Sequence, residues 1–526
     1  MRKLLAACAA LAAVVAVGSA SADPLRYGVA DDWPKFHPCG DIWWTSMKDI
    51  GYQDLRVTVQ WDAAAPTVIP FQSNLQDAID CAKLNDIRPI LAVYPAKPTS
   101  IGSNDSAQTA FASFVGLLGQ AFPDVNDFIV GNEPNVNRFW QPQFVNGLDA
   151  AATDYEHTLA KSYDALKTVR PDSIVWGPAI SSRGNDNASA AVNPGHSPVW
   201  FIKYMGDAYR ASHRTAKIFD EFDLHSYPPI QDTDLFSKTF RWPKAGAADL
   251  DRIKQALWDA FHGTGQPTVS EQTGGLDRAF AVPQALPINL DEEGEQTVVA
   301  GHEAAYDGTA ENVIPTSEWQ QARNQVELAE IAACDPAVKA LLYFPLIDEP
   351  GISTGFQSGN LFADLAPKQS YTAVKDKIAS AHGLCQGGVA GLSQSWLHSV
   401  GVLGADIFGG ASADPGSQPA DKPANARYWA FSVTASERTT FKATLSRVTA
   451  GSSPKIMLSA AGSANAYSKP LVKFNPRLLP AGTYRYRITL AAATNPQRTT
   501  TLTSKPFKVA RPSGAAASRR RRVLGS

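Results

Sequence analysis

Hydrophobic and polar residues follow two alternating patterns along the first 385 residues. Short apolar runs, rich in β-branched residues and bounded by polar or turn residues, predict strands. The predicted strands are 25–29, 55–60, 87–93, 127–131, 173–177, 218–225, 267–270 and 338–344. Between them, apolar residues recur at three- and four-residue spacings and predict helices. The predicted helices are 74–84, 108–122, 153–169, 200–211, 250–261, 317–333 and 371–378.

This alternation of strands and helices predicts an α/β fold with a parallel sheet and helices outside it. Eight strands over about 360 residues fit a (β/α)8 TIM barrel. A doubly wound sheet is the rival fold, but it usually has a glycine-rich turn after its first strand, and residues 28–32 do not form one. Residues 271–317, which include an acidic run at 291–295, show little periodicity. Such a long connection after a seventh strand is expected to lie over the active face.

The pattern changes after residue 385. Residues rich in Gly, Ala, Ser and Pro predict a linker, and short alternating strands beyond it predict a β-sandwich. Four consecutive arginines near the end indicate a basic, solvated tail. The predicted parts are a signal peptide at 1–22, a barrel at 23–385, a linker at 386–424, a β-sandwich at 425–510 and a basic tail at 511–526.

The first 22 residues have the pattern of a signal peptide. Arg2 and Lys3 precede an apolar run too short to span a bilayer, and residues 20–22, Ala-Ser-Ala, form a small-x-small cleavage site. A lipoprotein-type site at Cys8 is the less favoured alternative. No later run holds 18 uninterrupted apolar residues, so we expect a secreted, extracellular protein without a membrane partner.

Four cysteines remain after the signal peptide: Cys39, Cys81, Cys334 and Cys385. An even number in an exported chain permits disulfides, and of the three pairings we expect neighbours to pair, Cys39 with Cys81 and Cys334 with Cys385. Four buried thiols are the alternative. The spacings are wide and no Cys-x-x-Cys occurs, which argues against a zinc site.

Composition narrows the class of partner. The chain is 44% hydrophobic and 19% charged with a net charge of −2, which is typical of a globular protein and excludes the basic excess of a nucleic-acid-binding protein. Its 12 Trp, 15 Tyr and 23 Phe suit a flat, neutral ligand such as a sugar, although aromatic cores give the same count.

Two glutamates follow predicted strands at positions suited to catalysis. Asn132 and Glu133 directly follow the fourth predicted strand, and a proline comes next. Glu271 directly follows the seventh. In a barrel, the carboxyl ends of the strands carry the chemistry. Two opposed carboxylates about 5–5.5 Å apart perform retaining glycoside hydrolysis, one as acid/base and one as nucleophile.

Other residues could support such a pair. Strand alternation puts His225 and Tyr227 on one face, where they could bond a carboxylate or a sugar hydroxyl. Arg56, within the second predicted strand, is costly to bury unpaired, so we expect a carboxylate partner such as Glu271. Trp61 could form a sugar-stacking floor or pack in the core, and the sequence favours neither.

Together these residues resemble the clan A glycoside hydrolases, in particular the cellulase-like family 5 and the xylosidase-like family 39. The resemblance covers about residues 25–385 and is carried by Arg56, Asn132, Glu133, Pro134, His225, Tyr227 and Glu271. It departs from family 5 at residues 93–95, which lack the usual His, and after the eighth strand. There Asp348 and Glu349, further candidate site carboxylates, stand instead of the usual Trp.

The resemblance implies a (β/α)8 barrel and retaining hydrolysis with Glu133 as acid/base and Glu271 as nucleophile, and with the signal-peptide pattern we expect a secreted retaining β-glycosidase. Asn132 would bind the 2-hydroxyl of the substrate, a carbohydrate, and no metal or cofactor is required. We expect a monomer, with a C-terminal sandwich resembling the immunoglobulin-like modules of exported bacterial enzymes. A non-catalytic carbohydrate-binding barrel and a transglycosylase are the alternatives.

Overall fold

A computed structural model describes most of the chain. The described residues are 24–228, 240, 243–261, 263–268, 286–308, 313–335, 337–386, 411–414, 429–435, 439–449, 451, 453–464, 471–474, 479–492, 499–503 and 506–509. The predicted signal peptide at 1–22 and the basic tail at 511–526 lie outside them.

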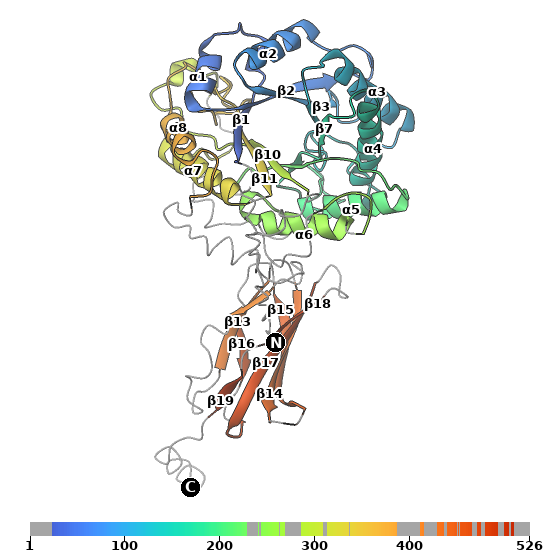
Figure 1. The fold of residues 1–526 in the computed structure, drawn as a ribbon, viewed down its shortest axis with the longest axis vertical. Helices are drawn as coiled ribbons and strands as arrows, with labels where there is room; N and C mark the ends of the chain where they lie inside the picture. The colour runs from blue at the N-terminus through green and yellow to red at the C-terminus, as the bar shows by residue number, and fades with distance from the viewer. Residues whose placement is uncertain are drawn as a thin grey trace, which may run out of the picture.

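The main sheet is parallel throughout, as predicted (Figure 1). Its strands are β1 (Arg26–Ala30), β2 (Asp54–Trp61), β3 (Arg88–Pro95), β4 (Asp127–Val130), β7 (Ile174–Trp176), β8 (Ile180–Ser181), β9 (Phe222–His225), β10 (Ile288–Glu293) and β11 (Val338–Tyr343). They lie in the order β7-β4-β3-β2-β1-β11-β10-β9-β8.

The two edge strands of the sheet, β7 and β8, are consecutive in the sequence. β7 pairs with β4 at one edge, and β8 pairs with β9 at the other. Only residues 177–179 separate β7 from β8, and an isolated parallel bridge joins Trp176 to Glu221, next to β9. The sheet therefore curls round on itself like a TIM-type barrel, which agrees with the predicted α/β class and not with a flat, doubly wound sheet.

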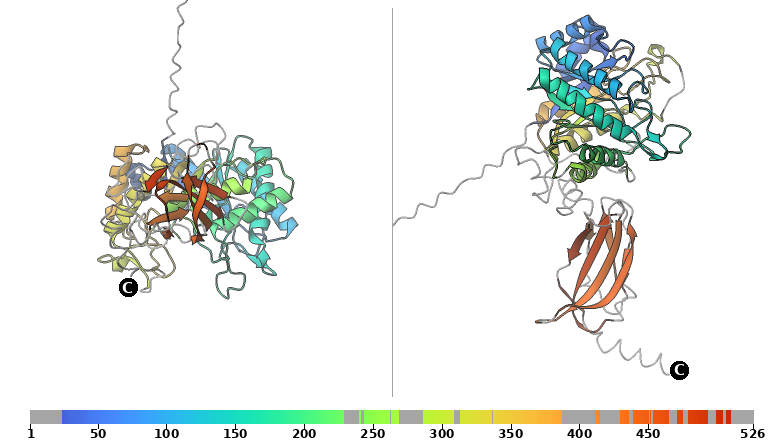
Figure 2. Two further views of the ribbon diagram at one scale, coloured as in Figure 1. Left: turned by 90° about the horizontal axis from the view of Figure 1, so that it is seen from below. Right: turned by 90° about the vertical axis from the view of Figure 1, so that its right-hand side faces the viewer.

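Helices lie around the outside of the curled sheet (Figures 1 and 2). They are α1 (Ile42–Ile50), α2 (Gln72–Leu84), α3 (Asp105–Ala121), α4 (Ala151–Val169), α5 (Pro198–Ala211), α6 (Leu250–Phe261), α7 (Glu318–Cys334) and α8 (Gln369–Ala381). α3 illustrates the pattern, since it buries Phe111, Phe114, Val115 and Leu118 on one face. None of the described helices is both long and apolar enough to cross a membrane.

Helix α1 was not predicted from the sequence. It has nine residues, and the side chain of Asp41 caps it by accepting hydrogen bonds from the backbone N–H groups of Trp43 and Trp44. Both tryptophans are fully buried. A helix of two and a half turns has too few apolar positions for its periodicity to be recognised in the sequence. Its formation therefore depends on capping and on packing against the rest of the protein.

The strand between β9 and β11 differs from the prediction. Residues 267 and 268 are not in a strand, and residues 269–285, including Glu271, lie outside the described residues. β10 occupies this place and pairs with both neighbours. It comes from the segment expected to be a long loop. Its sequence, INLDEE, ends in three acidic residues of low strand propensity, so its partners rather than its composition place it.

The C-terminal strands form antiparallel sheets, one of β12 (Ala411–Asp414), β13 (Trp429–Ala435) and β16 (Leu471–Phe474). The other holds β14 (Thr439–Val448), β15 (Lys455–Ala464), β17 (Gly482–Ala492), β18 (Thr499–Thr503) and β19 (Phe507–Val509). β12 lies within 386–424, the segment predicted to be a linker. The immunoglobulin-like arrangement stays a prediction.

The structure contains one of the two expected disulfides, between Cys39 and Cys81. Cys39 and Cys81 are bonded, with Cα atoms 5.7 Å apart, and the bond ties the loop after β1 to helix α2. Cys385 is also disulfide-bonded, as the second predicted pair requires.

Candidate active site

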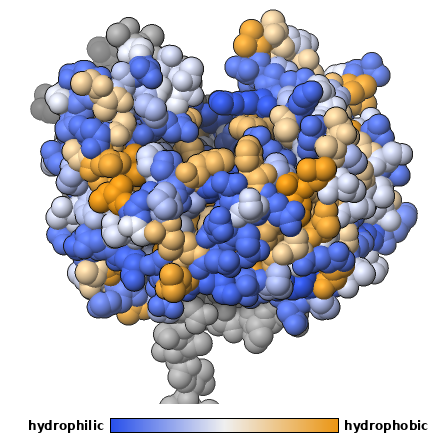
Figure 3. Space-filling model, turned by 90° about the horizontal axis from the view of Figure 1, so that it is seen from above, coloured by the Kyte–Doolittle hydropathy of each residue, from blue (hydrophilic) through white to orange (hydrophobic). Residues whose placement is uncertain are grey.

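A cavity of about 610 Å³ opens where the strands of the curled sheet end. The space-filling view is hollowed at its upper edge between two raised parts of the surface (Figure 3). Charged and amide groups lining the cavity include Asp31, Asp32, Arg56, Gln60, Asn132, Glu133, Arg138, Glu292, Asp348 and Glu349. Arg56 and Gln60 lie within β2 and Glu292 lies within β10, whereas the others follow β1, β4 and β11 at the carboxyl ends of the strands.

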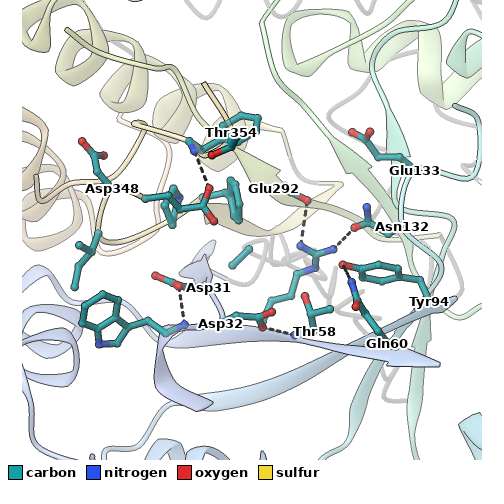
Figure 4. Close-up of a pocket in the computed structure, with 18 of the residues that line it drawn as sticks. Asp31, Asp32, Thr58, Gln60, Tyr94, Asn132, Glu133, Glu292, Asp348 and Thr354 are labelled. Carbon is teal, nitrogen blue, oxygen red and sulfur yellow. Dashed lines mark hydrogen bonds and ion pairs between the residues drawn. The ribbon is translucent and has the colours of Figure 1, made fainter. Parts of the chain in front are cut away.

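Glu133 follows the buried strand β4 and reaches the cavity from one side (Figure 4). Its backbone has a left-handed conformation, with φ at 42°, and its N–H donates to the carbonyl of Ala179 at 2.8 Å. Asn135 fixes the turn that follows, because its side-chain nitrogen donates to the carbonyls of Ser181, Arg183 and His196. The position of Glu133 is thus held by its own backbone hydrogen bond and by the side chain of Asn135, two residues later.

Glu292, near the end of β10, faces the same cavity. Its Oε1 accepts a hydrogen bond of 2.8 Å from the hydroxyl of Tyr227. Its Oε2 accepts one of 3.1 Å from Nη1 of Arg56 and lies 3.1 Å from Nδ1 of His225. Three groups that stabilise a negative charge therefore surround this carboxylate.

Arg56 has the carboxylate partners that the sequence analysis requires, although they are Glu292 and Asp291. Its Nη2 donates to Oδ1 of Asn132 at 2.7 Å (Figure 4). Its Nε lies 3.4 Å from Oδ2 of Asp291. Burial opposes the charge of this guanidinium, but the nearby Glu292 and Asp291 outweigh it and raise the pKa of Arg56. Arg56 is thus a cation within β2 that links this strand to Asn132 after β4 and to the acidic residues of β10.

His225 lies between the two glutamates. Its Nδ1 is 3.1 Å from Oε1 of Glu133 and 3.1 Å from Oε2 of Glu292, so these two oxygens are at most twice that distance, about 6.2 Å, apart. Its Nε2 is 3.5 Å from Asp291. Burial lowers the pKa of His225, but Glu292 and Asp291 outweigh it and raise that pKa well above its usual value. The neighbouring carboxylates therefore favour the charged, imidazolium form of His225.

Strand alternation sends the next residue, Glu293, to the other side of β10. Its Oε2 accepts a hydrogen bond of 2.7 Å from the hydroxyl of Ser226, which lies between His225 and Tyr227. Burial raises the pKa of Glu293 to about 8. The ends of β9 and β10 are thus joined on both faces, by Tyr227 and Glu292 within the cavity and by Ser226 and Glu293 behind it.

Asp31, after β1, is a carboxyl of the cavity with a shifted pKa. It accepts hydrogen bonds from the backbone N–H groups of Trp33 and Leu346 and from the indole of Trp43. Burial nevertheless raises the pKa of Asp31 to about 6. The contact with Leu346 joins the loops after β1 and β11, which form one wall of the cavity.

The structure brings together Arg56, Asn132, Glu133, His225 and Tyr227 from the predicted site. Trp61 is not part of it: its side chain is buried, meets Phe111 of α3 edge-on and donates to the carbonyl of Pro66, so core packing is the correct alternative.

Glu292 and Asp291 were missed as site residues. Their one sequence signal is the alternation of Ile288 and Leu290 immediately before the acidic run. Of the two further candidate carboxylates, Glu349 lines the cavity, and so does Asp348, which pairs with the buried Lys368.

Around His225, the available chemistry is that of two carboxylates, Glu133 and Glu292, with the Arg56 cation and the Tyr227 hydroxyl beside Glu292. Among the described residues, no group of three or more His, Cys, Asp or Glu side chains is arranged to hold a metal ion. A separation of about 5–5.5 Å between two such carboxyls suits attack by one and proton transfer by the other, whereas about 6.5–9.5 Å leaves room for a water between them.

Comparison with known proteins gives only distant likenesses. No family model matches the sequence, and no curated protein matches it. Among solved structures, a family 39 glycoside hydrolase from Bacteroides cellulosilyticus is 14% identical, with a TM-score of 0.45 over 89% of this chain and 81% of that one. A Thermotoga maritima β-glucosidase is 12% identical, with a TM-score of 0.42 over 68% and 98%. A Bacteroides uniformis β-glucuronidase is 10% identical, with a TM-score of 0.41 over 93% of this chain and 46% of that one. All three are glycoside hydrolases, at a similarity too low to assign a family or reaction to this chain.

Proposed function

We propose that this chain is a retaining glycoside hydrolase built on a (β/α)8 barrel, with Glu133 as the acid/base and Glu292 as the nucleophile. The observation that carries the proposal is the shared contact of both carboxylates with Nδ1 of His225. It limits their nearest oxygens to about 6.2 Å, which fits the short separation of retaining enzymes and leaves little room for an intervening water.

In the first step, Glu133 in its acid form donates its proton to the glycosidic oxygen while a Glu292 oxygen attacks the anomeric carbon. The bond from that carbon to the leaving group breaks, and an ester between the sugar and Glu292 forms. In the second step, Glu133 takes a proton from water, the water oxygen attacks the anomeric carbon, and the ester bond breaks. Glu292 leaves as a carboxylate and Glu133 is an acid again, so the cycle is balanced.

The neighbouring groups suit these roles. Tyr227 and Arg56 bond Glu292 and orient its lone pairs. Asn132, held by Arg56, lies beside Glu133, where its amide nitrogen can donate to a sugar hydroxyl. The charged His225 lets two carboxylates approach each other with less repulsion.

We further propose that the protein acts outside the cytoplasm. The signal-peptide pattern of residues 1–22 supports this, as does the disulfide between Cys39 and Cys81, since such bonds persist in oxidising compartments.

The test of the catalytic assignment compares three isosteric variants, Glu292→Gln, Glu133→Gln and Glu271→Gln, on a panel of aryl and oligosaccharide β-glycosides. Glu292→Gln should lower turnover by about 10⁴-fold or more on every substrate, because it removes the attacking charge. Glu133→Gln should harm poor leaving groups most. Glu271→Gln serves as the matched control and should stay within a few-fold of wild type.

Loss of activity in Glu271→Gln but not in Glu292→Gln would return the nucleophile to Glu271. Wild-type turnover in all three variants would overturn the two-glutamate mechanism. Binding without turnover by the wild type would favour the carbohydrate-binding barrel. Formation of longer glycosides from donor and acceptor sugars, in excess of hydrolysis, would identify a transglycosylase on the same site.

A further inference from the structure

We propose that a second cavity beside the active site binds distal sugar units of the substrate, so that the enzyme acts on oligosaccharides spanning both cavities. This inference rests on the proposed glycosidase function. The second cavity has a volume of about 480 Å³ and lies between the loop after β1 and helix α2. Phe36 and His37 line both cavities, which makes the two spaces adjacent.

Two exposed aromatic rings lie at or beside this junction: Phe36 lines both cavities, and Phe71 lines neither but contacts Phe36. Phe36 is 53% exposed and Phe71 is 63% exposed, and their rings meet edge to face with centroids 5.3 Å apart. Scattered apolar residues are common on surfaces, but a pair of aromatic rings in contact at the rim of an active-site cavity is typical of a binding surface. The apolar C–H face of a pyranose ring can pack on such rings.

The backbone at Phe71 supports a binding role. Phe71 precedes α2 in a left-handed conformation, with φ at 50°, and makes no side-chain cap to the helix. A bulky residue rarely adopts this conformation, and glycine or asparagine would be less strained there. The chain thus keeps a large ring at a position where neither burial nor backbone geometry favours it, and strain of this kind gathers at functional sites.

The polar lining fits sugar hydroxyls and disfavours an acidic ligand. Asn74, Asp77 and Asp80 of α2 line the second cavity and offer hydrogen-bond acceptors. The one lysine in its lining, Lys35, is buried, and its ammonium group already bonds the carbonyl of Thr58 and the carboxylate of Asp32. An uncharged oligosaccharide is therefore the expected occupant, not a uronate chain.

The site is also held rigid before binding. The disulfide between Cys39 and Cys81 joins the loop that carries Phe36 to the helix that begins after Phe71, and Cys39 and Cys81 themselves line the cavity. The side chain of Asn85 donates to the carbonyl of Cys81. A preformed surface loses less conformational entropy when it binds a ligand.

The experiment measures kcat/KM against chain length. The aryl panel first identifies the accepted monosaccharide, and β-linked gluco-, xylo- and manno-oligosaccharides of two to six units then serve as probes. For wild type we expect kcat/KM to rise by about tenfold or more from the shortest to the longest oligomer. In Phe36→Ala and Phe71→Gly, the ratio of kcat/KM for the longest to that for the shortest oligomer should fall by about tenfold, which corresponds to the loss of one good aromatic contact.

Phe71→Gly guards against misfolding, because glycine suits the left-handed backbone and the thermal midpoint should not fall. Trp319→Ala, which removes an exposed aromatic residue from α7, is the matched control and should keep the wild-type ratio. A wild-type kcat/KM that does not depend on chain length, or a ratio unaffected in both Phe variants, would overturn the distal site while leaving the glycosidase proposal intact.

If the wild type turns over none of the panel, the glycosidase proposal fails and calorimetric titration with the same hexasaccharides tests the distal site directly. Binding that weakens by about tenfold in Phe71→Gly would support the site. Absence of binding, or equal binding by wild type and variant, would overturn it.

Discussion

Glu133 and Glu292 each place one carboxylate oxygen 3.1 Å from the same nitrogen atom, Nδ1 of His225. The two glutamates are far apart in the sequence: Glu133 follows β4 and Glu292 lies within β10, and these strands are not neighbours in the sheet. The carboxylates favour the charged form of His225, which reduces their repulsion, and the two contacts keep these oxygens within about 6.2 Å of each other. The closeness of the two carboxylates thus depends on a third side chain, which comes from β9.

Azide should rescue the acid/base variant. In Glu133→Ala, activated aryl glycosides still form the ester on Glu292, because good leaving groups need little protonation, but no base then activates water. Azide fits the vacated space and should raise turnover at least tenfold, giving a β-glycosyl azide that NMR can identify. Glu349→Ala, which removes another carboxylate of the same cavity, is the control and should show no rescue.

The hydroxyl of Tyr227 should matter for rate more than for stability. Tyr227→Phe removes the 2.8 Å hydrogen bond to Glu292, and kcat/KM should fall by about 10- to 100-fold, since a hydrogen bond to a charged group is worth about 1.5–3 kcal/mol. Tyr163→Phe removes a comparable hydrogen bond to Asp220 outside the cavity and should leave kcat/KM unchanged. Equal rates for Tyr227→Phe and wild type would show that this bond does not support catalysis.

A buried ion pair near the cavity should be important for stability. The ammonium group of Lys368 lies 2.7 Å from Asp348, and both side chains are fully buried. Lys368→Met leaves a buried carboxylate without its cation and should lower the free energy of unfolding by about 3–5 kcal/mol. Lys375→Met breaks the exposed pair with Asp49 and should cost about 1 kcal/mol or less. Denaturant titration measures both, and equal effects would contradict the prediction.

Glu293 should make stability depend on pH. Its pKa is about 8 in the folded protein against an ordinary 4.5, so the folded state binds the proton more tightly than the unfolded state. The stabilisation of the folded state by protonated Glu293 is complete below about pH 4.5 and is lost as the pH rises through about 8. Glu293→Gln keeps an acceptor for Ser226 and cannot ionise. The free energy of unfolding of Glu293→Gln, relative to that of wild type, should therefore rise by up to about 5 kcal/mol between pH 4 and pH 9. Parallel pH profiles for the two proteins would refute this account.

The sequence determined those parts of the fold and site that depend on local pattern. The apolar run of β4, followed by Asn132 and Glu133, indicates a strand with candidate catalytic residues directly after its end. Strand alternation alone places His225 and Tyr227 on one face. The helices from α2 to α8 follow from apolar spacing. These features need only residues a few positions apart, so one sequence shows them.

Tertiary structure decided which strand completes the site. INLDEE ends in residues of low strand propensity, so its pattern does not predict β10, whereas the segment before Glu271 matched a strand pattern. β10 forms because β9 and β11 supply its backbone partners. Its acidic side chains are stabilised by groups distant in the sequence, namely Arg56 from β2, His225 from β9, and Ser226 and Tyr227 from the loop that follows β9. Burying carboxylates is favourable only where such partners converge, and that convergence exists only once the chain has folded.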